Sequence, residues 1–278
     1  MQLGPNLRRV VQRVANRLGY SVHRKDTIHG LLHDADDMRS YSEHATDVFG
    51  EYIPLPGVQM AASFSNENPL GMRFFSAMFG VELEWVNDLF RTIRDDKVDG
   101  AVVEFGVFEG YWMGVMFEAT EINGMADRPL IGFDSFRGLS APHPDFDHSF
   151  WKEGMYAATR SEVDERLKVA ERPRIKLIEG YFADSLITDE ATKIGSVAYA
   201  RIDCDIYEPA LQCLRYLSDR LSHGSILVFD DWPHRASIGE GRAFFEWAPT
   251  VPHLRFKFLG FGPWGHFYIR VWRRGLLS

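Results

Sequence analysis

The chain has 278 residues, 45% of them hydrophobic, and a formal net charge of −8. This length and apolar content allow one catalytic domain of about 200 residues with an N-terminal extension, and they argue against global disorder. The negative charge makes nucleic acid a poor default partner, and the two cysteines, Cys204 and Cys213, fit neither a zinc-ligand spacing nor a disulfide framework.

Residues 1–25 combine several arginines with apolar residues at helical spacing, which predicts a basic amphipathic helix. They lack the apolar run of a signal peptide, and no stretch of 18 apolar residues predicts a transmembrane helix, so we expect a cytoplasmic protein. We expect this helix to pack on the domain or on a second subunit of a homo-oligomer. Weak contact with an anionic membrane surface is the alternative.

Residues 26–80 alternate acidic, aromatic and Gly/Pro-bearing pieces, which indicates short helices and loops over an active site. Residues 1–80 are therefore predicted to be a helical extension or lid, and residues 81–278 the catalytic domain. A helix is predicted at 81–94, with one apolar stripe made of Val81, Trp85, Val86, Leu89, Phe90 and Ile93.

Strands and helices alternate from residue 101 onward. Apolar runs predict buried strands at 101–105, 130–134, 175–179, 197–203 and 225–229. Helices are predicted between them at 110–122, 160–171 and from Pro209 to Leu221. The alternating runs 255–259 and 266–271 predict an antiparallel hairpin. The expected fold is α/β and Rossmann-like, with a mostly parallel sheet, helices on both faces and this hairpin at the end.

Acidic side chains stand where the predicted strands end. In open α/β sheets ligands bind beyond the carboxyl ends of the strands, so these side chains are candidates for binding. Carboxylates on one rim repel each other unless a cation or hydrogen-bond donors lie among them. The five are Glu104, Asp134, Asp203, Asp230 and Asp231.

The turn after the first strand contains Gly106 and Gly110. A dinucleotide fingerprint would need glycine at 108, where Phe108 stands, and this weakens an interpretation as an NAD-binding protein. A glycine turn still lets a ligand approach the backbone, and Asp134 at the next strand end can accept hydrogen bonds from both hydroxyls of a ribose. A tight turn that serves packing alone is the alternative.

Asp203, Asp230 and Asp231 follow adjacent predicted strands and would form an all-oxygen site. Hard cations such as Mg²⁺ prefer oxygen ligands, and no cluster of His or Cys suggests zinc instead. Helix capping is the alternative, above all for Asp231. Asp205 could equally be a cap.

Five segments carry a resemblance to a known family. They are 103–107 (VEFGV), 133–139 (FDSFRGL), 179–186 (EGYFADSL), 201–208 (RIDCDIYE) and 229–231 (FDD). In this order, over roughly residues 80–250, they resemble the macrocin O-methyltransferase family. These are class I S-adenosylmethionine-dependent enzymes that methylate sugar hydroxyls of natural products. The D-x-D-x-Y-E element with the later Asp-Asp pair is the most specific part.

The resemblance implies a metal-dependent O-methyltransferase acting on a sugar or glycosylated natural product. It implies Mg²⁺ on Asp203, Asp230 and Asp231, with Asp203 also the general base. It implies S-adenosylmethionine on a further set, in which we include the neighbouring Gly110 and Ser135: Glu104, Gly106, Gly110, Asp134, Ser135, Tyr181, Phe182 and Asp184. The chain departs from the family at Cys204, Pro209 and the N-terminal region, which leaves the acceptor open.

Five further residues are tentative substrate contacts. His143 and His148 lie in the loop after the second strand, which is predicted to be part of a lid, with a solvated loop as the alternative. Tyr207 and Trp232 flank the predicted metal ligands and could form a platform for a sugar ring, with core packing as the alternative. His234 follows the Asp-Asp pair, where a surface role is equally compatible.

Other functions compete with this prediction. A methyltransferase of a catechol-like phenol would need similar residues. An oxidoreductase that binds a dinucleotide or nucleotide-sugar is disfavoured, because the chain has no evident Tyr-x-x-x-Lys pair. A non-catalytic binding module would be expected to lose the carboxylate cluster.

Overall fold

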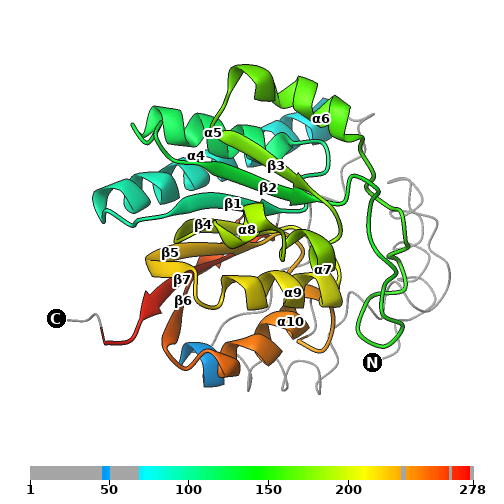
Figure 1. Ribbon diagram of the computed structural model, residues 1–278, viewed down its shortest axis with the longest axis vertical. Coiled ribbons are helices and arrows are strands. Elements are labelled where there is room, and N and C mark those ends of the chain that lie inside the picture. The colour runs from blue at the N-terminus through cyan, green and yellow to red at the C-terminus, as the bar shows by residue number, and fades with distance from the viewer. Residues whose placement is uncertain (1–45, 51–68, 233–235, 263–264, 276–278) are drawn as a thin grey trace.

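A seven-stranded sheet with the strand order β3-β2-β1-β4-β5-β7-β6 forms the centre of the computed structural model (Figure 1). The structure describes residues 46–50, 69–232, 236–262 and 265–275. Five strands are parallel: β1 (Ala101–Phe105), β2 (Leu130–Asp134), β3 (Ile175–Glu179), β4 (Val197–Ile202) and β5 (Leu221–Phe229). The other two strands, β6 (Leu254–Phe261) and β7 (Phe267–Arg273), form an antiparallel hairpin. The hairpin joins the sheet because β7 pairs antiparallel with β5.

Helices cover both faces of this sheet (Figure 1). One layer contains α4 (Pro69–Asp95) and α5 (Tyr111–Ile122), and the other contains α9 (Tyr207–Leu217) and α10 (Gly239–Trp247). Successive strand residues point to opposite faces, so Val102 packs in the α4/α5 layer and Val103 in the α9/α10 layer. The shorter elements are α6 (Arg160–Leu167), η2 (Val169–Glu171), α7 (Phe182–Ser185), α8 (Asp189–Thr192) and η3 (Ala248–Thr250).

The predicted α/β fold, with a mostly parallel sheet and a terminal hairpin, is confirmed. The strands β1, β2 and β3 have the predicted bounds. The predicted helix 160–171 instead stops at Leu167, because Lys168 takes a left-handed backbone conformation (φ 52°) before η2. The helix expected from Pro209 to Leu221 begins at Tyr207 and ends at Leu217, since Leu221 already belongs to β5.

The helix predicted at 81–94 is longer and differs in its buried face. It begins at Pro69, so it crosses the predicted boundary at residue 80, and the division into extension and catalytic domain stays a prediction. Val86, Phe90 and Ile93 are buried as expected, but Val81 is 56% exposed and Glu82 takes the buried position instead. The predicted helix at 1–25 lies outside the described residues.

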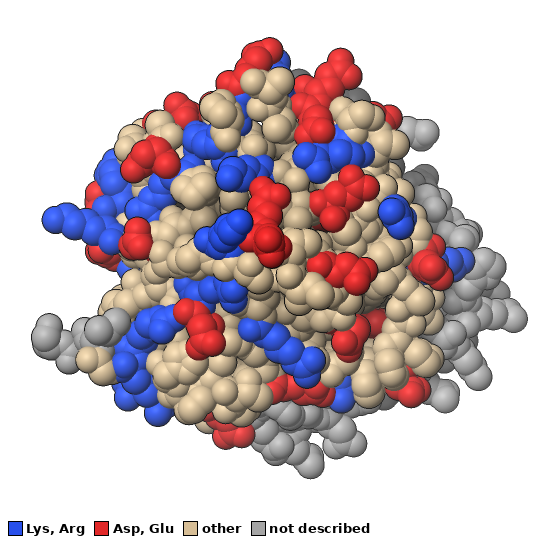
Figure 2. Space-filling view, viewed as in Figure 1, with Lys and Arg blue, Asp and Glu red and all other residues tan. Residues whose placement is uncertain are grey.

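The surface shown in Figure 2 carries Lys and Arg side chains interspersed with Asp and Glu. It therefore presents no uniformly basic face of the kind that nucleic acid attracts. Among the described helices, none has the length and apolar character needed to cross a membrane.

Candidate active site

A cavity of about 510 Å³ lies at the carboxyl ends of the strands. Its wall combines the turn after β1, the loop after β2 and the starts of α7 and α9. Gly110 and Asp184 stand outside the lining, Gly110 as the residue before α5 and Asp184 as an exposed residue of α7. The other predicted cofactor and metal residues line it: Glu104, Gly106, Asp134, Ser135, Tyr181, Phe182, Asp203, Asp230 and Asp231.

Gly106 joins the two predicted sites. Its φ is 91°, and a Cβ atom there would overlap the carbonyl oxygen of Asp203, so only glycine fits. Its N–H donates to the Phe133 carbonyl at 2.8 Å, while the Asp203 N–H donates to the Phe105 carbonyl at 2.9 Å. The predicted close approach of the backbone is thus present, and Asp203 is the group that Gly106 approaches.

Asp134 organises the turns on either side of it. Its carboxylate accepts hydrogen bonds from the Phe108 N–H (2.8 Å) and the Phe136 N–H (2.6 Å), and both of these residues have positive φ. Burial raises the pKa of Asp134, and the two hydrogen bonds oppose that rise. Each carboxylate oxygen keeps a second lone pair, so Asp134 can still accept hydrogen bonds from a ligand in the cavity.

Glu104 and Ser135 complete this side of the cavity. The Ser135 hydroxyl donates to the Gly138 carbonyl at 2.8 Å and accepts from the Arg137 N–H at 3.0 Å, which shapes the loop after β2. Glu104 is almost wholly buried, and its Oε2 has no hydrogen-bond partner. Burial raises the pKa of Glu104 well above its usual value. An unpartnered carboxylate oxygen fits a ligand with a cationic or hydrogen-bond-donating group.

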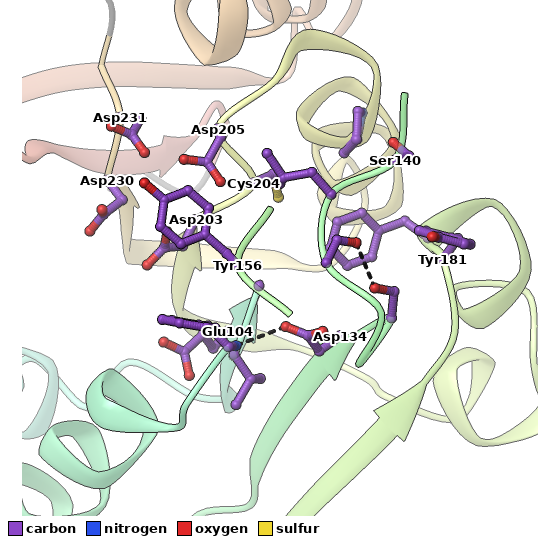
Figure 3. A pocket seen from close by; sticks show the side chains of 18 of the residues that line it. Glu104, Asp134, Ser140, Tyr156, Tyr181, Asp203, Cys204, Asp205, Asp230 and Asp231 are labelled. Atoms are coloured by element: carbon purple, nitrogen blue, oxygen red, sulfur yellow. Dashed lines mark hydrogen bonds between the residues drawn. The ribbon is translucent and has the colours of Figure 1, made fainter. Parts of the chain in front are cut away.

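The three aspartates expected to bind a metal converge (Figure 3). One oxygen from each of Asp203, Asp230 and Asp231 lies within 4.8 Å of the others. Burial raises the pKa values of Asp203 and Asp231. Three carboxylates this close need positive charge among them, and an all-oxygen set suits a hard divalent cation.

Part of that positive charge comes from Arg201, a fully buried residue of β4. Its Nε lies 3.3 Å from Oδ2 of Asp203, and its Nη2 forms an ion pair with Asp230. The guanidinium stacks over the Trp112 ring at 4.0 Å. Arg201 therefore holds two of the three aspartates at fixed positions.

His266 supports Asp230 from the other side. Its Nε2 lies 3.0 Å from Oδ1 of Asp230, and its Nδ1 lies 2.8 Å from Oε1 of Glu82, which also accepts from the Tyr268 hydroxyl. Burial, and then the charge of Arg201, lower the pKa of His266. A line of polar contacts thus runs from Glu82 in α4 through the hairpin to the carboxylate cluster.

Glu240, a fully buried residue of α10, holds the backbone around the cluster. Its Oε1 accepts from the N–H groups of Cys204 (2.9 Å) and Asp205 (3.2 Å), and its Oε2 accepts from the Asp231 N–H (3.3 Å). The N-caps of α9 and α10 have no side-chain hydrogen bond, so neither Asp205 nor Asp231 caps these helices. Burial and the neighbouring Asp231 raise the pKa of Asp205.

The two tentative aromatic substrate contacts lie in the core. The Tyr207 hydroxyl donates to Glu246 at 2.6 Å, and its buried ring packs against Phe146. Trp232 is buried and stacks on Phe267 with ring centroids 4.0 Å apart. Neither residue lines the cavity. Their positions agree with core packing, which was the alternative interpretation for both.

The tentative histidine contacts also lie away from the described lining. The His143 ring stacks on Phe146 at 4.0 Å, and His148 is exposed. Their loop serves the fold through Asp147, which accepts from the N–H groups of His143 and Tyr207, each at 2.7 Å. His234 lies outside the described residues.

The family model of the macrocin O-methyltransferases (TylF) matches residues 67–246, more than half of the chain. The chain belongs to this family. The predicted O-methyltransferase activity is thereby confirmed, and the family supports S-adenosylmethionine as the methyl donor.

Two relatives from Streptomyces share part of the sequence of this O-methyltransferase. The demethyldecarbamoylnovobiocin O-methyltransferase of Streptomyces niveus is 25% identical over 191 residues, which are 63% of this chain and 70% of that protein. An 8-demethyl-8-(2,3-dimethoxy-alpha-L-rhamnosyl)-tetracenomycin-C 4'-O-methyltransferase of Streptomyces olivaceus is 28% identical over 151 residues, which are 51% of this chain and 56% of that protein.

Solved structures share the fold of this O-methyltransferase. The calicheamicin methyltransferase CalS11 is 22% identical with a TM-score of 0.58, covering 92% of this chain and 99% of that chain. Its apo structure, described as a TDP-rhamnose 3'-O-methyltransferase, is 23% identical with a TM-score of 0.52, covering 90% and 100%. This similarity agrees with the predicted class I methyltransferase fold.

Proposed function

We propose that the enzyme methylates a hydroxyl group of a sugar or glycosylated natural product, with S-adenosylmethionine as donor and Mg²⁺ at Asp203, Asp230 and Asp231. The observation that carries the proposal is that these carboxylates line the same cavity as Gly106 and Asp134. The names of two similar proteins, one for a rhamnosyl-tetracenomycin and one for TDP-rhamnose, support a sugar hydroxyl as the acceptor.

In this proposal, the turns after β1 and β2 hold the cofactor. S-adenosylmethionine, when bound, supplies a methyl group on a sulfonium centre whose sulfur keeps the bonding electron pair as the methyl group leaves. Asp134 accepts hydrogen bonds from the ribose hydroxyls, and the Glu104 carboxylate, which lines the same cavity, accepts from the amino group. The tight turn at Gly106 lets the cofactor lie against the backbone.

Asp203 acts as the general base in the proposal. Arg201 lies beside its Oδ2, and the Asp203 carboxylate, which is also proposed to hold Mg²⁺, takes the proton of the acceptor hydroxyl as the oxygen forms its bond to the methyl carbon. Mg²⁺, when bound, supplies positive charge that lowers the pKa of a neighbouring hydroxyl. Arg201 and His266 keep Asp203 and Asp230 in place, so the remaining requirement is alignment of the reactants.

Chelation tests the metal part of the proposal. The purified chain is incubated with S-adenosylmethionine and a panel of glycosides and nucleotide sugars, and formation of S-adenosylhomocysteine is measured. Activity should be lost in EDTA and restored by excess Mg²⁺. Full activity after exhaustive chelation would remove the metal and assign the aspartates another role. Thermal stabilisation by S-adenosylmethionine, but not by NAD, tests the cofactor separately.

The first 80 residues are a second part of the proposal. We propose a helical extension whose basic helix packs on the domain or on a second subunit of a homo-oligomer, with weak contact to anionic lipid as the alternative. Deleting residues 1–25 should alter the oligomeric state if the helix packs on a second subunit, and should lower the stability of the domain if it packs there. In the alternative, the deletion should abolish sedimentation with anionic vesicles at low salt.

A further inference from the structure

The loop between β2 and α6 (residues 135–159, the β2–α6 loop) forms one wall of the cavity. Ser140, Trp151 and Tyr156 of this loop are among the lining residues. Burial, and then the charges of nearby aspartates, raise the pKa of Tyr156, and Figure 3 shows its side chain beside the carboxylate cluster. A ligand that reaches the carboxylates from the cavity would therefore contact this loop, and the position of the loop sets the width of the cavity there.

Backbone hydrogen bonds close the base of the β2–α6 loop. The N–H of Leu139 donates to the Met155 carbonyl at 2.8 Å, and the N–H of Gly154 donates to the Leu139 carbonyl at 2.9 Å. Gly138 has a φ of 81°, and a Cβ atom there would overlap the Met155 carbonyl oxygen, so the two ends of the loop approach each other closely. These bonds do not reach the tip of the loop at residues 143–148, which needs contacts of its own.

Asp147 holds the tip of the β2–α6 loop. Its side chain is buried, and its two carboxylate oxygens accept hydrogen bonds from different elements. Oδ2 accepts from the N–H of His143 within the loop, and Oδ1 accepts from the N–H of Tyr207, the first residue of α9, each at 2.7 Å. The N-cap of α9, Ile206, makes no side-chain hydrogen bond. Asp147 therefore supplies, from far away in the chain, an acceptor that the start of this helix would otherwise lack.

A second contact joins the tip of the loop to α10. The Phe146 carbonyl accepts from the N–H of Gly239, the first residue of α10, at 2.7 Å. The Phe146 ring stacks on the His143 ring at 4.0 Å and contacts the Arg242 guanidinium of α10 at 3.7 Å. In the chain, α9 follows Asp203 and α10 follows the Asp-Asp pair. The tip of the loop is thus bonded to the starts of both helices that come after the proposed metal ligands.

We propose that Asp147 is a positioning residue for the acceptor. One side chain bonds to the loop tip and to the helix that follows Asp203, so it fixes the spacing between the loop wall and the carboxylates. The inference rests on the proposed function and deepens it, because it assigns acceptor affinity to a residue that does not itself line the cavity. Asp145 is a matched control in the same loop, since it is exposed and its side chain bonds to no other described residue.

Steady-state kinetics of the full chain test this role. With an acceptor found in the panel of glycosides and nucleotide sugars, Asp147→Ala should raise the KM for the acceptor about tenfold, the range of a lost charged hydrogen bond. The affinity for S-adenosylmethionine, measured by calorimetry, should not change. Asp147→Asn keeps one accepting oxygen and should show a smaller rise, and Asp145→Ala should show none. Unchanged KM in Asp147→Ala, or an equal loss of affinity for S-adenosylmethionine, would overturn the proposal.

A substitution at the other end of the bond isolates its contribution. Tyr207→Pro places a ring where the N–H donates to Asp147, and proline is well accommodated at the first position of a helix. Tyr207→Ala loses the same aromatic side chain but keeps the N–H. The KM for the acceptor should be several-fold higher in Tyr207→Pro than in Tyr207→Ala, and this difference should vanish when each is combined with Asp147→Ala. No difference, or an equal difference in both backgrounds, contradicts the role of this bond.

Hydrogen exchange tests the hold on the loop without an acceptor. Amides of residues 143–155 should exchange at least about fivefold faster in Asp147→Ala than in the wild type or in Asp145→Ala. Peptides from β1 and β2 should exchange equally in all three proteins. Equal exchange of the loop in all three would show that Asp147 does not hold it. Methylation with an unchanged KM overturns the inference alone, whereas absence of methylation across the whole acceptor panel overturns the proposed function and the inference together.

Discussion

The two halves of the cavity are built differently. In the cofactor half, the turns after β1 and β2 are held by their own backbone N–H groups, which donate to Asp134. In the carboxylate half, the aspartates after β4 and β5 depend on side chains from distant elements, namely Glu82 in α4, Glu240 in α10 and His266 before β7. The cofactor half is therefore formed by local contacts within two turns, whereas the carboxylate half depends on contacts between elements that are far apart in the chain.

The largest expected effect comes from substitutions in the carboxylate half, which should lower catalysis without changing cofactor binding. Asp203→Asn removes the charge and the proposed base together, so kcat should fall about 10²–10⁴-fold. Calorimetry should show unchanged affinity for S-adenosylmethionine. Asp230→Asn should lower activity by weakening the affinity for Mg²⁺, and a high Mg²⁺ concentration should restore part of the activity. Loss of cofactor binding in Asp203→Asn would show that the halves are not separable.

The next effect tests whether the carboxylate half depends on α10. Glu240→Ala leaves the N–H groups of Cys204, Asp205 and Asp231 without their acceptor in a buried place. The free energy of unfolding should fall by about 3 kcal/mol, measured by urea denaturation, and the affinity for Mg²⁺ should weaken. Glu165→Ala, at an exposed position of α6, is the control and should change stability by about 0.5 kcal/mol at most. Similar values for the two variants would contradict this dependence.

A smaller effect is expected in the cofactor half. Asp134→Ala should weaken binding of S-adenosylmethionine by about 1–3 kcal/mol, as expected for the loss of a charged hydrogen-bond acceptor. The affinity for Mg²⁺, measured by calorimetry, should stay the same because Asp134 is not among the three converging aspartates. Unchanged affinity for S-adenosylmethionine would remove Asp134 from the cofactor site.

The smallest effect concerns pH. Burial raises the pKa of Glu104, so the folded protein holds this proton more tightly than the unfolded chain does. The free energy of unfolding of the ligand-free protein should therefore fall as the pH rises from the ordinary glutamate pKa toward the raised one. Glu104→Gln should make this fall shallower. Parallel curves for wild type and variant would contradict a buried, titrating Glu104.

The sequence predicts the cofactor half well because its features are local. The apolar runs of β1 and β2 lie between clear turn signals, and their bounds match the structure. Gly106 and Asp134 stand at strand ends, where the topology of a parallel sheet brings them together. The same argument placed Asp203, Asp230 and Asp231 in one cluster.

The supports of the carboxylate half were missed because they depend on contacts between residues far apart in the chain. Two of them leave a weak signal. Arg201 is a charged residue inside an otherwise apolar strand, and Glu82 occupies the helical spacing of Val86 and Ile93, where an apolar residue is expected. The sequence gives no comparable sign for His266 or Glu240, and α10 itself was not predicted. A charged residue at a position where the pattern predicts an apolar one thus indicates a buried polar partner far away in the chain.

The position of β7 in the sheet determines which strands can pair early in folding. β7 follows both β5 and β6 in the chain but lies between them in the sheet. On the ribosome, β6 therefore emerges before the strand it pairs with, and the inner edge of β5 stays open to other chains until β7 arrives. His266 directly precedes β7 and reaches Asp230 in the same step. A nascent chain can thus complete its cofactor turns while still unable to hold its aspartates.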